Sequence, residues 1–293
     1  MAKKNFRIES DSMGRMKVPK DALYGAQTAR AVENFPISNL KFKRSFIEAL
    51  GVIKFSAAKV NLDLKLISPQ VAKSIMNSAE EVIQGKHDLE FVVDIFQTGS
   101  GTSTNMNANE VIATLANKKN KSMIKVHPND HVNLCQSSND VIPSAMHISI
   151  YKLILNSLIP SLRILEKALG AKSKEFNRII KIGRTHLQDA TPVTLGQEFS
   201  GYFSQINNGI ERIKKSSNEL LYLAQGGTAV GTGLNSKKGF DKKFALQCKK
   251  ITGLPFKTSP NKFEALATHD TMVEVSGSLN TIAASLFKIA NDI

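Results

Sequence analysis

One histidine lies in a polar segment between two long stretches in which apolar residues recur at helical spacing. The segment Gly183-Arg-Thr-His-Leu-Gln-Asp189 places Thr185 and His186 beside groups that can orient an imidazole ring. Because imidazole exchanges a proton near neutral pH, a histidine held in a connecting segment can carry a proton in catalysis. A surface or structural histidine has the same setting, so this segment alone leaves both interpretations open.

Glycine, hydroxyl and amide residues dominate the segment from Gln97 to Glu110, which precedes a short helical pattern at 111–116. Backbone N–H groups and the hydroxyls of Ser100, Thr102 and Thr104 can together bind a carboxylate. A flexible loop followed by a helix cap has the same composition. No Gly-Lys-Ser/Thr follows, so the segment is not a phosphate-binding P-loop.

Two further polar segments precede the first long helical pattern. His127-Pro-Asn-Asp130 has the chemistry of a turn, and Gln136 to Pro143 is dense in residues that cap helices. Capping alone explains Ser138, Asn139 and Asp140. The unpaired N–H groups at the start of a helix also attract anions, so a cap and a carboxylate site are compatible there.

Apolar periodicity predicts the helices that position these segments. Residues 1–40 are interrupted by glycine and proline, which predicts extended structure and turns with little core of their own. The glycine-rich residues 225–235 should end the second long helix and reverse the chain. Helices are expected at 42–66, from Pro69 to about Gln84, at 143–169, again at 175–182, at 193–223 and at 262–293. Pro160 should kink the helix at 143–169. Thr191 should be the N-cap of the helix near 193–223, with Pro192 as its first residue.

The three longest of these helices carry apolar residues on more than one face, which is typical of a bundle buried on several sides. A helix of about 30 residues spans roughly 45 Å, more than a small domain needs. We therefore expect the surplus apolar surface to be buried between subunits.

The bulk composition disfavours several functional classes. The chain has 293 residues, 42% of them hydrophobic, and a formal net charge of +14. Its lysines are scattered, with dense zones only at 118–125 and 237–250 and no interleaved aromatic residues, so we expect no nucleic-acid partner. Cys135 and Cys248 form no disulfide framework, and neither a signal core nor a membrane-length apolar run occurs. A soluble, cytoplasmic protein is expected.

Five separated motifs occur in order: Gly99-Ser-Gly-Thr-Ser-Thr-Asn-Met-Asn-Ala-Asn-Glu110, His127-Pro-Asn-Asp130, Gln136-Ser-Ser-Asn-Asp140, Gly183-Arg-Thr-His-Leu-Gln-Asp189 and Gly226-Gly-Thr-Ala-Val-Gly-Thr-Gly233. Together they resemble the class II fumarases of the fumarase/aspartase superfamily. The resemblance implies an all-α fold, a long-helix bundle of the fumarase/aspartase type. It also implies a mostly helical N-terminal domain with an extended arm at 1–138, a central bundle domain at 139–293 that is incomplete at its C-terminus, and a homotetramer with each active site assembled from three subunits.

The resemblance also implies roles for particular residues. His186 would be catalytic, a dicarboxylate would be bound by Ser100, Gly101, Thr102, Ser137, Ser138, Asn139 and Thr185, and an accessory dicarboxylate site would contain His127, Pro128, Asn129 and Asp130. Interconverting fumarate and L-malate requires removal of a weakly acidic proton next to a carboxylate. Uncharged donors can stabilise the aci-carboxylate intermediate, and a histidine can protonate the leaving hydroxyl. No metal or organic cofactor is implied.

Two departures from the family pattern qualify these expectations. The loop Gly-Ser-Ser-x-Met-Pro-x-Lys-x-Asn-Pro, whose serine is the expected carbon-proton base, is absent from the 293 residues. The chain therefore resembles the N-terminal part of a longer enzyme, and alone it should associate without turning over malate. Ile124 stands where an arginine is frequent near the accessory site, which weakens the expectation of dianion binding there.

Two alternatives remain open from the sequence. An aspartate ammonia-lyase belongs to the same superfamily, but Gly99-Ser-Gly101, Ser138 and Gly227 favour a fumarase, because aspartases tend to have Ala, Thr and Ala at these places. A non-catalytic, bundle-forming fragment is the alternative from another class.

Overall fold

The computed structural model describes residues 5–119 and 124–293, so the start of the chain and the middle of the lysine-rich zone at 118–125 lie outside the described residues. The chain folds into two compact units. Unit 1 contains the described residues up to Ile150 and Leu221–His269, and unit 2 contains Tyr151–Leu220 and Asp270–Ile293. These units differ from the domains expected at 1–138 and 139–293, which remain a prediction about the family's architecture.

The N-terminal arm has more structure than the sequence suggested. Strands β1 (Phe6–Asp11) and β2 (Gly14–Pro19) form an antiparallel hairpin, and helix α1 (Ala26–Asn34) follows. Residues of the hairpin and the helix form a small core of their own, made of Met16, Val18, Ala26 and Ala29. The hairpin confirms the predicted extended structure and turns, whereas helix α1 and this small core were not predicted.

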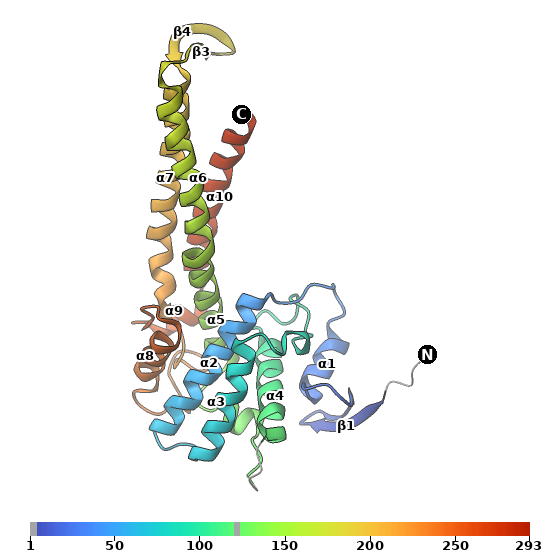
Figure 1. Ribbon diagram of the computed structural model, residues 1–293. Coiled ribbons are helices and arrows are strands. Elements are labelled where there is room, and N and C mark those ends of the chain that lie inside the picture. Colours follow the sequence, from blue (N-terminus) through green and yellow to red (C-terminus); the bar gives the residue numbers. More distant parts are fainter. Residues whose placement is uncertain (1–4, 120–123) are drawn as a thin grey trace. The chain divides into compact units, whose positions relative to one another are not determined.

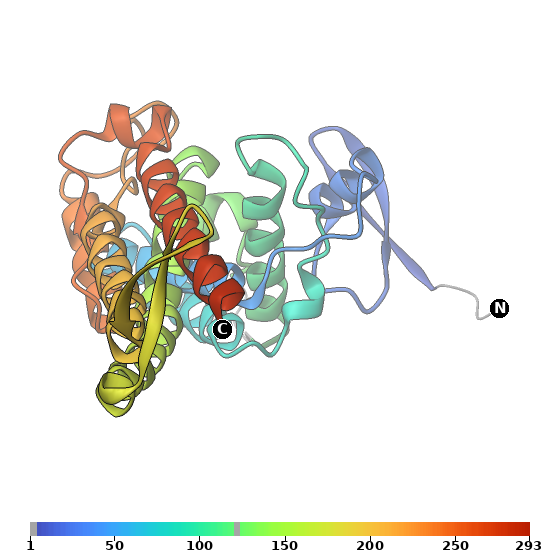
Figure 2. The same cartoon turned by 90° about the horizontal axis from the view of Figure 1, so that it is seen from above.

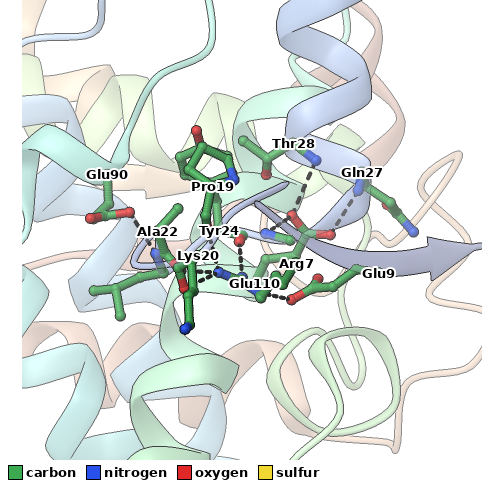
Figure 3. A network of polar contacts seen from close by, with 12 residues as sticks. Arg7, Glu9, Pro19, Lys20, Ala22, Tyr24, Gln27, Thr28, Glu90 and Glu110 are labelled. Atoms are coloured by element: carbon green, nitrogen blue, oxygen red, sulfur yellow. Dashed lines mark hydrogen bonds and ion pairs between the residues drawn. The ribbon is translucent and has the colours of Figure 1, made fainter. Parts of the chain in front are cut away.

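Helix α1 escaped prediction because its start is capped by a distant residue. Gly25 provides no side-chain cap. Instead, the Glu110 carboxylate accepts hydrogen bonds from the backbone N–H groups of Gly25, Gln27 and Thr28, at 2.8, 2.9 and 3.1 Å (Figure 3). No local sequence pattern can reveal a cap supplied from more than 80 residues away.

Arg7 closes the turn between the hairpin and α1. Its guanidinium donates hydrogen bonds to four backbone carbonyls and to one carboxylate, which the reader can follow in Figure 3. The acceptors are the carbonyl oxygens of Pro19, Lys20, Ala22 and Tyr24 and the carboxylate of Glu9.

Three helices of unit 1 lie side by side: α2 (Arg44–Asp63), α3 (Pro69–Ile83) and α4 (Thr102–Lys119) (Figure 1). The first two agree with the predicted ranges, and Ser68 caps α3 with Pro69 as its first residue. Helix α4 begins well before the predicted residue 111. Its first half is polar, yet Asn105, Asn107 and Asn109 are buried, so burial of amides concealed the helix from a search for apolar periodicity.

A long helical run links α5 (Ser138–Leu153) to α6 (Ile159–Glu175) through a π-helical turn at Ile154–Leu158, just before Pro160. The run starts five residues earlier than predicted. Although the sequence has no uninterrupted apolar run of membrane length, the helical run Ser138–Arg178 is long and apolar enough by composition to cross a membrane. Core helices of soluble proteins meet the same criterion, so the absence of a membrane span stays a prediction.

Unit 2 is built on α6, α7 (Leu195–Ser217) and α10 (Asp270–Asp292), with α7 packed against both other helices (Figures 1 and 2). Ile206, Ile210 and Ile213 of α7 are fully buried. Gly209 lets α10 approach closely, since a Cβ there would lie 2.1 Å from the Ile282 Cδ1 atom.

Between α6 and α7 the chain forms an antiparallel hairpin of β3 (Ile180–Thr185) and β4 (Gln188–Thr194). The helix predicted at 175–182 and the cap predicted at Thr191-Pro192 were therefore wrong. The true cap is Thr194, which forms a capping box with Gln197. Cross-strand pairing of this segment outweighs the helical spacing of its apolar residues.

The remaining elements belong to unit 1. They are α8 (Phe240–Thr252), α9 (Lys262–Ala267), and the parallel pair β5 (Tyr222–Leu223) and β6 (Lys257–Thr258). The helix predicted at 262–293 is in fact two, α9 and α10, and the glycine-rich 225–235 segment follows β5 rather than the second long helix. Despite these corrections, the all-α, long-helix fold class is confirmed.

Candidate active site

Two of the predicted substrate-binding segments meet in unit 1. Gly101 has a left-handed φ of +68°, and a Cβ there would lie 2.7 Å from the Ile142 side chain on α5. Only glycine permits this conformation so close to α5 without strain. The loop that carries Ser100 and Thr102 is thereby held against the helix that begins with Ser138.

The hydroxyls of Ser100 and Thr102 are exposed at the start of α4, with their oxygens 2.9 Å apart. Thr104 is different, because its side chain is buried and hydrogen-bonded to Gln97. The Gln97 side chain also accepts the Thr104 backbone N–H at 2.8 Å. The expectation that the Thr104 hydroxyl faces a carboxylate was therefore wrong, while Ser100 and Thr102 remain accessible.

Asp140 fixes the start of α5 from within. Its carboxylate is fully buried and accepts the backbone N–H groups of Ser137 at 2.9 Å, Gly226 at 3.0 Å and Thr228 at 2.8 Å. Burial raises the pKa of Asp140 to about 6, and the three N–H donors oppose that rise. The cap predicted from the sequence thus joins two motifs that are far apart in the chain.

Asn139 makes a second link to the glycine-rich segment, because its side-chain nitrogen donates to the Ala229 carbonyl at 2.7 Å. Beside it lies a cavity of about 310 Å³ that contains Ser100, Asn139 and His269. The other lining residues are Gly99, Ile142, Pro143, Ala229 and Leu266. The sequence reasoning missed His269. Its only local signal was a histidine just before the last long helix.

Ser138 is held by an amide from α4. Asn105 donates from Nδ2 to the Ser138 hydroxyl oxygen at 3.1 Å, and its own carbonyl oxygen accepts from the Lys54 ammonium at 2.8 Å. Lys54 and Asn105 are both fully buried. Lys54 was not identified from the sequence, because a lysine within an apolar helix pattern gives no sign of being buried. Asn105 lies within the motif Gly99–Glu110, but the sequence analysis gave it no role of its own.

Thr185 and His186 belong to unit 2, so they are not on the same compact unit as the other predicted substrate-binding residues. His186 and Leu187 form the two-residue turn between β3 and β4, with left-handed φ values of 50° and 62°. Two such residues match the twist of a hairpin. The His186 side chain is exposed and has no hydrogen bond or ion pair with any residue that the structure describes.

The predicted accessory residues lie together on a π-helical turn, Pro128–Val132, which His127 caps. The Nδ1 atom of His127 lies 3.2 Å from the Asp130 backbone nitrogen and 3.0 Å from its carboxylate. His127, Pro128 and Asn129 line a cavity of about 1020 Å³ together with the cationic Arg15 and Lys125. The acidic Glu9, Asp11 and Glu110 line the same cavity, so cationic and anionic side chains face it together.

Comparisons with known proteins show the family of this chain. A family model described as lyase matches residues 14–293. The chain belongs to this lyase family. The mitochondrial fumarate hydratase of Saccharomyces cerevisiae is 56% identical over 99% of this chain and 60% of its own length. A class II fumarate hydratase of Methylorubrum extorquens is 53% identical over 98% of this chain and 62% of its own length.

Solved structures of this lyase family show the same fold. A crystal structure of a class II fumarase from Schistosoma mansoni matches with a TM-score of 0.95 and 43% identity, over 98% of this chain and 64% of that one. A fumarate lyase:delta crystallin from Brucella melitensis, bound to cobalt, matches with a TM-score of 0.94 and 38% identity, over 98% and 64%. The chain spans about 60% of the length of the curated relatives it matches.

Proposed function

We propose that this chain is part of a fumarate hydratase, which interconverts fumarate and L-malate. The observation that carries the proposal is identity of 53–56% to proteins named fumarate hydratase along almost the whole chain. The accessible hydroxyls of Ser100 and Thr102 and the hydroxyls of Ser137 and Ser138 provide the uncharged donors that a carboxylate and an aci-carboxylate intermediate need.

His186 would act as the acid that protonates the leaving hydroxyl, directly or through water, with Thr185 beside it. The exposed turn that presents His186 suits a residue that acts on a site completed by another copy of the chain. The reaction as proposed needs no metal or organic cofactor. Within the described part of the chain, no group of three or more His, Cys, Asp or Glu residues is arranged to hold a metal ion.

A homotetramer is proposed on the apolar side chains that unit 2 leaves exposed. Ile164 on α6 is 74% exposed, and Val273 and Phe287 on α10 are 71% and 73% exposed. Burying such surface against further copies is favourable by roughly 25 cal/mol per Å². Sedimentation velocity should show a tetramer, and a monomer would contradict the proposal.

The cytoplasm remains the proposed location. Both cysteines are buried free thiols, which is typical of a reducing compartment. Several relatives are named mitochondrial, so cell fractionation with antibodies to cytosolic and matrix markers is the relevant test.

The activity is tested with the full-length protein. Fumarate appearing from L-malate is followed by its ultraviolet absorbance, in parallel with L-aspartate as substrate. We expect turnover of malate and none of aspartate. Turnover of aspartate alone would instead identify the superfamily's aspartate ammonia-lyase, and turnover of neither would support a non-catalytic bundle protein.

A further inference from the structure

We infer that Asn105, itself held by the buried Lys54, is a positioning residue that turns the hydroxyl proton of Ser138 toward the substrate carboxylate. The inference rests on the proposed function, because it assigns the orientation of one donor in that same site. It concerns Lys54, which lies outside the five motifs, and Asn105, which lies in the first motif but was given no role there.

The Lys54 ammonium has three hydrogen atoms and three partners. It donates to Asn105 Oδ1 at 2.8 Å, to Asn133 Oδ1 at 3.0 Å and to Gln136 Oε1 at 3.0 Å. Burial lowers the pKa of Lys54 to about 7, and the charge of nearby Asp140 opposes this. All three partners are hydrogen-bond acceptors. None of them can donate to the lone pair that a neutral Lys54 amine would carry, so they favour the ammonium form.

These contacts fix the orientation of the Asn105 amide. An ammonium can only donate, so the oxygen of Asn105 must face Lys54 and its nitrogen must face away. That nitrogen donates to Asn133 Oδ1 at 3.2 Å and to Ser138 Oγ at 3.1 Å. Both amide hydrogens are thus used, and Asn105 cannot accept a hydrogen bond from Ser138 on that side.

The consequence for Ser138 follows from its having a single proton. Because its oxygen accepts from Asn105, the hydroxyl proton must point elsewhere, and the half-buried side chain leaves the outer side open. A donor orientated before the substrate arrives needs no reorganisation when a carboxylate binds. Ser138 thereby becomes a fixed donor at the start of α5.

The test exchanges the donor of Asn105 for an acceptor. In the full-length enzyme, Asn105→Asp keeps an oxygen for Lys54 and forms an ion pair with it, but its second oxygen draws the Ser138 proton inward. We expect KM for malate to rise about 10- to 100-fold with little change in kcat, as for loss of one hydrogen bond to a charged group. Ser138→Ala should raise KM similarly, and the double variant should be no worse than either single variant.

Asn107→Asp is the matched control, because Asn107 lies on the same helix, is buried, and donates to the Glu90 carbonyl rather than to a site residue. It should lose stability in urea unfolding without a comparable rise in KM. An unchanged KM in Asn105→Asp, or effects of the two single variants that multiply in the double variant, would overturn the inference while wild-type turnover upholds the proposed function. Absence of malate turnover in the wild type would overturn both.

Discussion

The Ser137–Asp140 segment and the His186 turn are both predicted parts of one active site, but they are held in opposite ways. Around the first, Asp140 accepts three backbone N–H groups, and Asn105 fixes Ser138. His186 is exposed and makes no side-chain hydrogen bond within the described chain. The predicted carboxylate-binding segment is therefore fixed by contacts within unit 1, whereas the proposed catalytic histidine has no such contacts.

The largest expected effect concerns completion of the site. The 293-residue chain should form oligomers by light scattering but turn over malate only at background, because the serine and lysine loop of the family is absent from it and a catalytic unit that lacks one member loses most of its rate. The full-length protein is the control. Strong activity of the 293 residues would assign proton abstraction to a group within them.

Replacement of His186 should have the next largest effect. In the full-length enzyme, His186→Asn should lower kcat by about 10²- to 10⁴-fold, as expected for loss of a general acid, while the urea midpoint stays unchanged. The exposed turn gives the imidazole no role in folding. His87→Asn, which removes a histidine paired with Glu81, is the control and should keep full turnover. Normal turnover of His186→Asn would remove His186 from the mechanism.

A substitution at Gly101 tests whether helix α5 holds the loop that carries Ser100 and Thr102. Gly101→Ala combines a left-handed φ with a contact of 2.7 Å to Ile142, so it should reduce the free energy of unfolding by about 1–3 kcal/mol. Gly99→Ala, in the same loop, has no atom within 4 Å of the added Cβ and should cost much less. Equal losses in the two variants would show that α5 does not hold this loop.

The smallest effect is a pH dependence of stability caused by Lys54. Its pKa is about 7 in the folded chain and ordinarily 10.5, so above pH 7 the unfolded chain binds more protons. Stability of the wild type relative to Lys54→Met should therefore rise between pH 7 and 9, by at most about 1.4 kcal/mol per pH unit. Asp140, with a pKa of about 6, titrates mainly below this window. Urea unfolding at several pH values measures the difference, and a flat profile would contradict the lowered pKa of Lys54.

The sequence by itself determined the helical fold class and was enough to propose most of the candidate site residues in unit 1. Apolar spacing predicted the bounds of α2 and α3 almost correctly. Each helix buries one face against neighbouring helices, and such burial requires apolar residues at helical spacing in the sequence. The turn and cap chemistry of Gly99–Thr102 and Ser137–Asp140 was also readable, because glycine, serine and asparagine act there through bonds to nearby backbone groups.

The tertiary structure alone revealed those elements and contacts that depend on residues far apart in the chain. Helix α1 is capped by Glu110, the polar half of α4 is helical because its amides are buried, and the β3–β4 hairpin replaces a predicted helix because its strands pair with each other. Lys54 and Asn105 became candidates for the site through burial and hydrogen bonds across the fold, which leave no local pattern in the chain. His269 became one because the fold places it beside the cavity that Ser100 and Asn139 line.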